Sequence, residues 1–212
     1  DQALPLYQRA LDIREKTVGP QHPATAISLT NLAVLYEAMG SYDQALPLQQ
    51  RALKIYDQAV GAEHPDTASS LNNLAGLYKA MGAYDQALPR YRRALKIREK
   101  VLGPTHPDTA NSLNNLALLY QVMGASEQAL PLYLRTIKII ETSLGPEHPH
   151  AIVAVSNLGT LYLARKDYKT AEAYFRQSRS TGGLVELDLA RGQPGNALKL
   201  LQAKTPTWRE LP

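Results

Sequence analysis

The stretch His106–Glu147, HPDTANSLNNLALLYQVMGASEQALPLYLRTIKIIETSLGPE, decides the fold, because most of its pattern recurs along the 212-residue chain. It begins with His-Pro, and this dipeptide occurs four times with a constant spacing of 42 residues. A fixed period of this length predicts an array of structural repeats. The recurring positions include His22, His64, His106 and His148; Asn31, Asn73, Asn115 and Asn157; and Ala45, Ala87, Ala129 and Ala171.

Each repeat is predicted to contain two helices. The first begins at His-Pro, where proline suits the first helical position because its missing N–H needs no partner there. Apolar residues then follow at spacings of three and four from Ala110 to Tyr120, and Gly124 marks the helix end. The second helix begins near Ala125–Ser126 and ends at Gly145. Neither helix can bury its apolar stripe alone, so the hairpins are expected to stack on one another.

The composition excludes several classes of function. The chain has no cysteine, which rules out disulfides, thiolate metal sites and cysteine nucleophiles. No apolar run approaches the ~18–20 residues of a membrane span, so no membrane association is expected. A phosphate-binding loop and a nucleophile elbow are both missing from the sequence, so we predict no catalysis and no cofactor.

Two groups of charged or ligating residues have simpler explanations than a binding site. The four His-Pro histidines lie on successive hairpins, ~10 Å apart, which is too far for one metal ion. They are therefore predicted to cap helices or pack in loops, with a two-ligand ion site at His148 and His150 as the alternative. The basic stretch Arg90–Lys100 is expected to be a solvated helix face, because only Tyr91 could stack on a nucleic-acid base. No metal and no nucleic acid is expected.

Other motifs in the same frame point to a known family. Asn-Leu-Ala, followed by Gly, Tyr and Ala and then by Arg-Ala-Leu, resembles the tetratricopeptide repeat. The longer period, with ALKIREKVLGPTHPDTANSLNNLALLY at 94–120, resembles the kinesin-light-chain subtype. The resemblance implies an all-α fold, a right-handed superhelical solenoid of antiparallel helix hairpins.

The resemblance also suggests how the chain is divided. Residues 1–181 are expected to form the repeat array, and 182–204 a degenerate, shortened hairpin. Residues 205–212, including Trp208, resemble a linker or tail. Residue 1 aligns with Asp43 and Asp85, inside a repeat, so the chain is expected to be a piece of a longer, possibly bacterial, protein. The units are a partial first repeat and then 22–60, 64–102, 106–144 and 148–181.

In the family, the first helices line the concave groove, and asparagines there grip the main chain of a bound peptide. A carboxamide can donate to a peptide C=O and accept from an N–H, whatever the peptide sequence. The alternative is that some amides bond to the next repeat and fix the register of stacking. Asn72 and Asn114 are predicted to face the groove, because Thr30 and Ser156 replace them in the other repeats. The candidate residues are Asn31, Asn72, Asn73, Asn111, Asn114, Asn115 and Asn157, with Lys79, Gln121 and Glu37 on the same face.

These features favour a cytoplasmic protein–protein interaction scaffold whose partner is a protein or peptide. One alternative is a spacer or self-association platform that uses an apolar face of the first helix at Leu4, Tyr7 and Leu11. Another is the sensor or regulatory region of a larger enzyme, either a caspase-like protease or a nucleotide-hydrolysing signalling protein.

Overall fold

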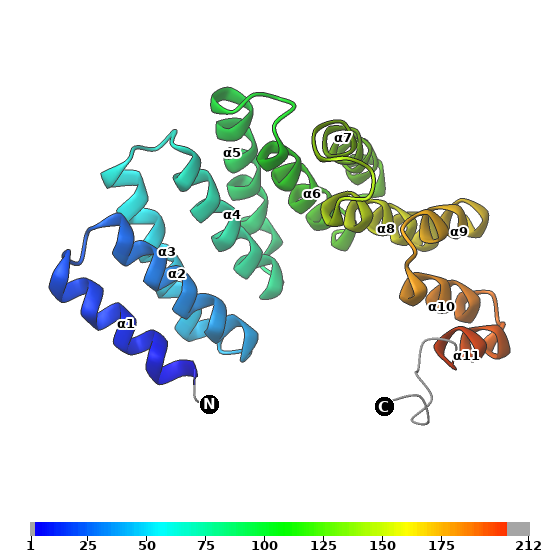
Figure 1. Cartoon of the computed structure of the whole chain (residues 1–212), viewed down its shortest axis with the longest axis horizontal. Helices are drawn as coiled ribbons and strands as arrows, with labels where there is room; N and C mark the ends of the chain where they lie inside the picture. Colours follow the sequence, from blue (N-terminus) through cyan, green and yellow to red (C-terminus); the bar gives the residue numbers. More distant parts are fainter. Residues whose placement is uncertain (1–2, 203–212) are drawn as a thin grey trace, which may run out of the picture. The chain divides into compact units, whose positions relative to one another are not determined.

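The structure is a computed structural model that describes residues 3–202, and every regular element in this range is an α-helix (Figure 1). Trp208 and the rest of the expected tail lie outside the described residues. The chain divides into two compact units, Asp1–Leu119 and Tyr120–Pro212. Both units are built from consecutive helices that pack as antiparallel hairpins.

The first unit contains the helices that carry most of the candidate residues. The first helices of its repeats are α2, α4 and α6, and the second helices are α1, α3 and α5. The helix α6 continues past Leu119 into the second unit. The bounds are α1 Ala3–Thr17, α2 Pro23–Ala38, α3 Tyr42–Ala59, α4 Pro65–Ala80, α5 Tyr84–Val101 and α6 Pro107–Val122.

The second unit begins with the end of α6 and becomes less regular toward its C-terminal part. The helix α9 has 10 residues, whereas the equivalent helix α7 has 19. The bounds are α7 Ser126–Leu144, α8 Pro149–Ala164, α9 Tyr168–Gln177, α10 Thr181–Ala190 and α11 Pro194–Gln202.

The His-Pro dipeptides cap the first helices, as the sequence predicts. In each repeat the histidine Nδ1 accepts a hydrogen bond from the backbone N–H two residues later, as at His64, where the distance to Asp66 N is 3.1 Å. The same bond recurs at His22, His106 and His148. Capping satisfies a backbone donor that has no partner inside the helix. No cluster of three or more metal-ligating side chains occurs in residues 3–202.

The glycines expected at the helix ends have the backbone conformation that such ends require. Gly124 follows α6 with φ of 75°, and Gly145 follows α7 with φ of 94°. Both angles lie in the region that side chains disfavour, so each glycine turns the chain into the next element at little cost.

Small residues at repeated positions form the contacts between helices. Ala33, Ala75 and Ala117 are fully buried on the first helices, as are Ala45, Ala87 and Ala129 on the second helices. Gly159 takes the place of this alanine in α8 and lies against Phe175 of α9. Phe175 itself is fully buried and also contacts Gly183 of α10. Small side chains at these positions therefore allow the helices to pack closely.

We predict that Gly159→Ala destabilises the second unit. A Cβ at this position would lie 2.7 Å from the ring of Phe175, and this fully buried ring would have to shift. Overpacking of this kind costs about 1–3 kcal/mol. Thermal or urea denaturation followed by circular dichroism measures the change.

Gly182→Ala is the matched control for this experiment. Gly182 lies in α10, is exposed, and would meet no atom within 4 Å if it carried a Cβ. Alanine is the better helix former, so this variant should be as stable as the parent or slightly more stable. Equal effects of the two substitutions would contradict the packing explanation.

Candidate functional site

Three carboxamides at the same repeat position have no hydrogen-bond partner within the described residues. They lie on the consecutive first helices α2, α4 and α6 of the first unit. Asn31 and Asn73 are exposed, and Asn115 is half-buried. No side-chain hydrogen bond joins any of the three to another residue of the range 3–202. Their donors and acceptors are therefore available to a ligand.

Two of these amides line one cavity of the first unit, with a volume of about 170 Å³. The cavity lies among α2, α3 and α4. Most of the groups that line it are polar, with hydroxyls from all three helices and one carboxylate. The lining residues are Ile27, Thr30, Asn31, Tyr56, Asp66, Ser69, Ser70 and Asn73.

Asn72 does not face the groove as the sequence analysis expected. Its side chain is only 7 % exposed, and its Nδ2 donates a hydrogen bond to Ser112 Oγ of α6 at 2.9 Å. The Oδ1 atom is buried and has no partner among the described residues. The residue therefore joins α4 to α6, which is the register role that the sequence analysis considered as the alternative.

The two other candidates on α6 are less exposed than Asn31 and Asn73. Asn111 and Asn114 are both half-buried, and Asn114 has polar interactions within the chain. The equivalence of Asn114 with Asn72 makes a structural contribution from Asn114 the simpler explanation.

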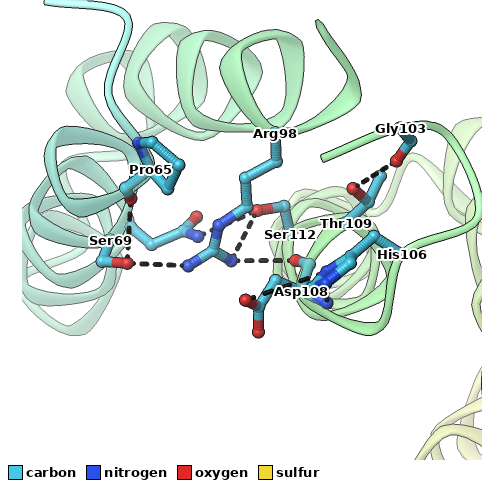
Figure 2. A network of polar contacts seen from close by, with 9 residues as sticks. Pro65, Ser69, Arg98, Gly103, His106, Asp108, Thr109 and Ser112 are labelled. Atoms are coloured by element: carbon cyan, nitrogen blue, oxygen red, sulfur yellow. Dashed lines mark hydrogen bonds and ion pairs between the residues drawn. The ribbon is translucent and has the colours of Figure 1, made fainter. Parts of the chain in front are cut away.

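Arg98 also departs from expectation, because it does not belong to a solvated face of the basic stretch. Its side chain is 8 % exposed and lies between α4 and α6 (Figure 2). The guanidinium donates to Ser69 Oγ at 2.9 Å, to Ser112 Oγ at 3.0 Å and to the carbonyl of Asp108 at 2.9 Å. Burial lowers the pKa of Arg98, and the Asp108 carboxylate opposes this effect. Three helices are therefore held by one buried cation.

The rest of the basic stretch behaves as the sequence predicts. Arg93 pairs with Asp57 at 3.1 Å, and Lys100 pairs with Glu63 at 2.7 Å. The recurring arginine at the Arg93 position meets a carboxylate one repeat earlier as well, since Arg51 pairs with Glu15 at 2.6 Å. These ion pairs link α5 to α3 and to the loop after α3, and they link α3 to α1.

Two charged candidates face each other on adjacent first helices. Burial raises the pKa of Glu37, and the positive charge of Lys79 partly lowers it again. Burial likewise lowers the pKa of Lys79, and Glu37 opposes this. The charge of each residue therefore partly offsets the effect of burial on the other.

Two candidates belong to the second unit. Gln121 is half-buried, and its Oε1 accepts a hydrogen bond of 2.7 Å from the hydroxyl of Tyr133. This acceptor is therefore already used. Asn157 is half-buried in α8 and has interactions within the chain.

The apolar face expected on the first helix is only partly bare. Leu4 and Leu11 are half-buried and pack against the core formed by α2 and α3. Tyr7 is exposed, as are Leu6 and Ile13. The expectation is therefore wrong for Leu4 and Leu11 and correct for Tyr7.

Four residues that line the cavity or form the hydrogen-bond network beside it are not predicted from the sequence. These are Tyr56, Ser70, Arg98 and Ser112. The sequence contains one signal for them, because Tyr56 stands between Arg14 and Arg98 at a repeat position that changes again to Ile140.

We predict that the two neighbouring asparagines of α4 differ in their effect on stability. Asn72→Ala removes a buried hydrogen bond and Asn73→Ala removes none, whereas both substitutions change helix propensity equally. The Asn72→Ala variant should therefore be less stable than the Asn73→Ala variant by about 1 kcal/mol. Urea denaturation of both variants measures this difference, and equal midpoints would contradict the assignment.

Comparison with known proteins agrees with this geometry. The family model described as tetratricopeptide repeat matches residues 1–58, 30–100, 66–142 and 108–181. No curated protein sequence matches the chain. No helix in residues 3–202 is long and apolar enough to span a membrane.

Several solved structures are similar to the chain. BtubC (BKLC) from P. vanneervenii superposes with a TM-score of 0.77 at 19 % identity, covering 99 % of this chain and 94 % of that one. A Podosopora anserina structure, assigned as a kinesin light chain with nearly identical TPR-like repeats, gives 0.67 at 28 % identity, covering 84 % and 85 %. The apo form of RapI gives 0.76 at 20 % identity, covering 95 % and 77 %.

The family match extends over residues 1–181, and the helices, their caps and their packing follow the same repeat. The chain belongs to the tetratricopeptide repeat family.

Proposed function

We propose that the chain is an interaction scaffold that binds an extended peptide segment of a partner protein through the amides of Asn31, Asn73 and Asn115. One observation carries this proposal. The three amides recur at one position of adjacent helices and have no partner within the described residues, and two of them line one cavity.

The chemistry of the amides suits a peptide main chain. Each offers two donors and one acceptor, so it can bond to both the C=O and the N–H of an extended segment. An extended peptide presents these groups at regular intervals, as repeated helices present the amides. Binding through the main chain would give affinity with little dependence on the peptide sequence, and the surrounding side chains would supply selectivity.

The similarity to a kinesin-light-chain structure supports the same proposal. Asparagines of the first helices hold a peptide backbone in the kinesin-light-chain family, and the resemblance implies the same role in this chain. The proposal includes a cytoplasmic location and no catalytic step in this chain. Because Glu37 and Lys79 carry opposite charges, we expect no strong general preference for an acidic ligand.

A peptide screen tests the proposal. The chain is first used to select binders from a random peptide library, and their affinities are then measured by fluorescence anisotropy. The triple variant Asn31→Ala, Asn73→Ala and Asn115→Ala should weaken binding by about tenfold or more, because several hydrogen bonds to the peptide are lost. Stability should change little, since none of these amides has a partner in the described part of the chain.

The chain offers a control of the same chemistry and number. Gln44, Gln86 and Gln128 recur every 42 residues and are exposed on the second helices α3, α5 and α7. Their triple replacement by alanine should leave peptide affinity unchanged. Full affinity in the asparagine triple variant, or an equal loss in the glutamine triple variant, would overturn the proposal.

A further inference from the structure

The cavity beside Tyr56 lies at a repeat position that holds an arginine in two other repeats, Arg14 and Arg98, and an isoleucine, Ile140, in a third. Arg98 donates to the carbonyl of Asp108, and Arg14 makes the equivalent bond to the carbonyl of Ala24 at 3.0 Å. Tyr56 stands at the same repeat position between these two arginines. It makes no such bond, and a cavity of about 170 Å³ lies against it.

Ser70, in this cavity, lacks both of the partners that its counterpart has. One repeat later, Ser112 Oγ accepts hydrogen bonds from Arg98 and from Asn72. The corresponding donors near Ser70 are replaced by Tyr56 and Thr30. Ser70 is 1 % exposed, lines the cavity, and its Oγ has no partner among the described residues. A buried hydroxyl without a partner indicates that a ligand group or an ordered water completes the site.

The charges around the cavity favour a cation. Asp66 lines it, and no lysine or arginine of the described residues lies within ion-pair distance of this carboxylate. His64 Nδ1 lies 3.5 Å from the carboxylate and accepts a hydrogen bond from the backbone N–H of Asp66. Burial raises the pKa of the Tyr56 phenol, and the negative charge of Asp66 adds to this effect.

The positive charge of Arg98 lies near the cavity and would repel a cation there, but the Asp108 carboxylate offsets this charge. Arg98 donates to Ser69 Oγ, and Ser69 also lines the cavity. The Asp108 carboxylate acts on the Arg98 guanidinium. Asp66 is the equivalent residue 42 positions earlier, and it lines the cavity. The Arg98 guanidinium therefore has the Asp108 carboxylate near it, and a cation in the cavity would have the Asp66 carboxylate.

We propose that this cavity binds the guanidinium of an arginine side chain from the peptide held in the groove. The guanidinium would donate to Ser70 Oγ and to the Asp66 carboxylate, and its plane would lie against the ring of Tyr56. Arginine suits the site better than lysine, because its fork of N–H donors can reach several acceptors at once, as Arg98 does in the next repeat. This inference rests on the proposed peptide groove, and it adds a side-chain preference to it.

Two small probes test the cavity without any peptide. N-acetyl-arginine-N-methylamide and its citrulline analogue, which has the same shape but no charge, are titrated into the ¹⁵N-labelled chain. The arginine probe should shift the amide signals of Tyr56, Ser69 and Ser70 and bind about tenfold more tightly than the citrulline probe. The variant Asp66→Asn should reduce the difference in affinity between the arginine and citrulline probes, because it removes the negative charge.

A third test introduces into the cavity the arginine that two other repeats have at this position. Tyr56→Arg should place a guanidinium in the cavity, as Arg98 does one repeat later, and so abolish binding of the arginine probe. The control Gln58→Arg adds the same charge to an exposed position of α3 and should leave binding nearly unchanged. Circular dichroism should show that both variants remain helical.

Peptides from the library provide the second arm, in which the selected sequences should contain arginine at one fixed position. That preference should disappear with Tyr56→Arg. Peptides that need Asn31 and Asn73 but show no arginine preference would overturn this inference and leave the proposed function standing. Equal binding of the arginine and citrulline probes, or a cavity that holds only water, would also overturn it. Binding of the arginine probe without any asparagine-dependent peptide would refute the proposed function instead.

Discussion

Close packing of helices at alanine and glycine positions is the constraint on which the rest of the structure depends. Ala33, Ala75 and Ala117 are fully buried, and in α8 glycine at the same position accommodates Phe175. Helices can pack this closely only where the side chain between them is small. Because the small residue recurs every 42 positions, each hairpin of a unit stacks in the same register. Every other recurring residue then occupies an equivalent place in its repeat.

A constant register allows one repeat position to perform different tasks in different repeats. At position 98 an arginine is buried and joins three helices, whereas at position 56 a tyrosine leaves a cavity lined by hydroxyls and a carboxylate. The amides next to the core differ in the same way. Asn72 joins α4 to α6, and its neighbour Asn73 has no side-chain partner in the described residues. A residue that joins two helices and a residue with the proposed ligand-binding role are thus neighbours in the sequence.

Much of the fold could be predicted from the sequence because the signals are local or periodic. The His-Pro caps depend on residues within one helical turn, and the glycines after the helices act through their own backbone angles. The period itself showed which residues are equivalent. The family match and the all-helical structure confirm this part of the prediction.

The candidate site could be predicted only in part, because it depends on contacts between helices. Adjacent residues on a helix differ by about 100° in direction, and the period does not say which of the two meets the next repeat. The sequence alone therefore favours the groove for Asn72, although Ser112 lies against it. It also favours solvent for Arg98, because the hydroxyls that accept from its guanidinium come from two other helices. Asn31 and Asn73 have the exposure expected of binding residues, and their role remains a proposal.

The most direct measurement is a crystal structure of the chain with a peptide selected from a random library. We predict that the peptide lies extended across α2, α4 and α6, the helices that carry Asn31, Asn73 and Asn115. Its main-chain N–H and C=O groups should lie within about 2.7–3.2 Å of the amides of Asn31 and Asn73. A peptide seated on the second helices, with both amides still turned to solvent, would contradict the account.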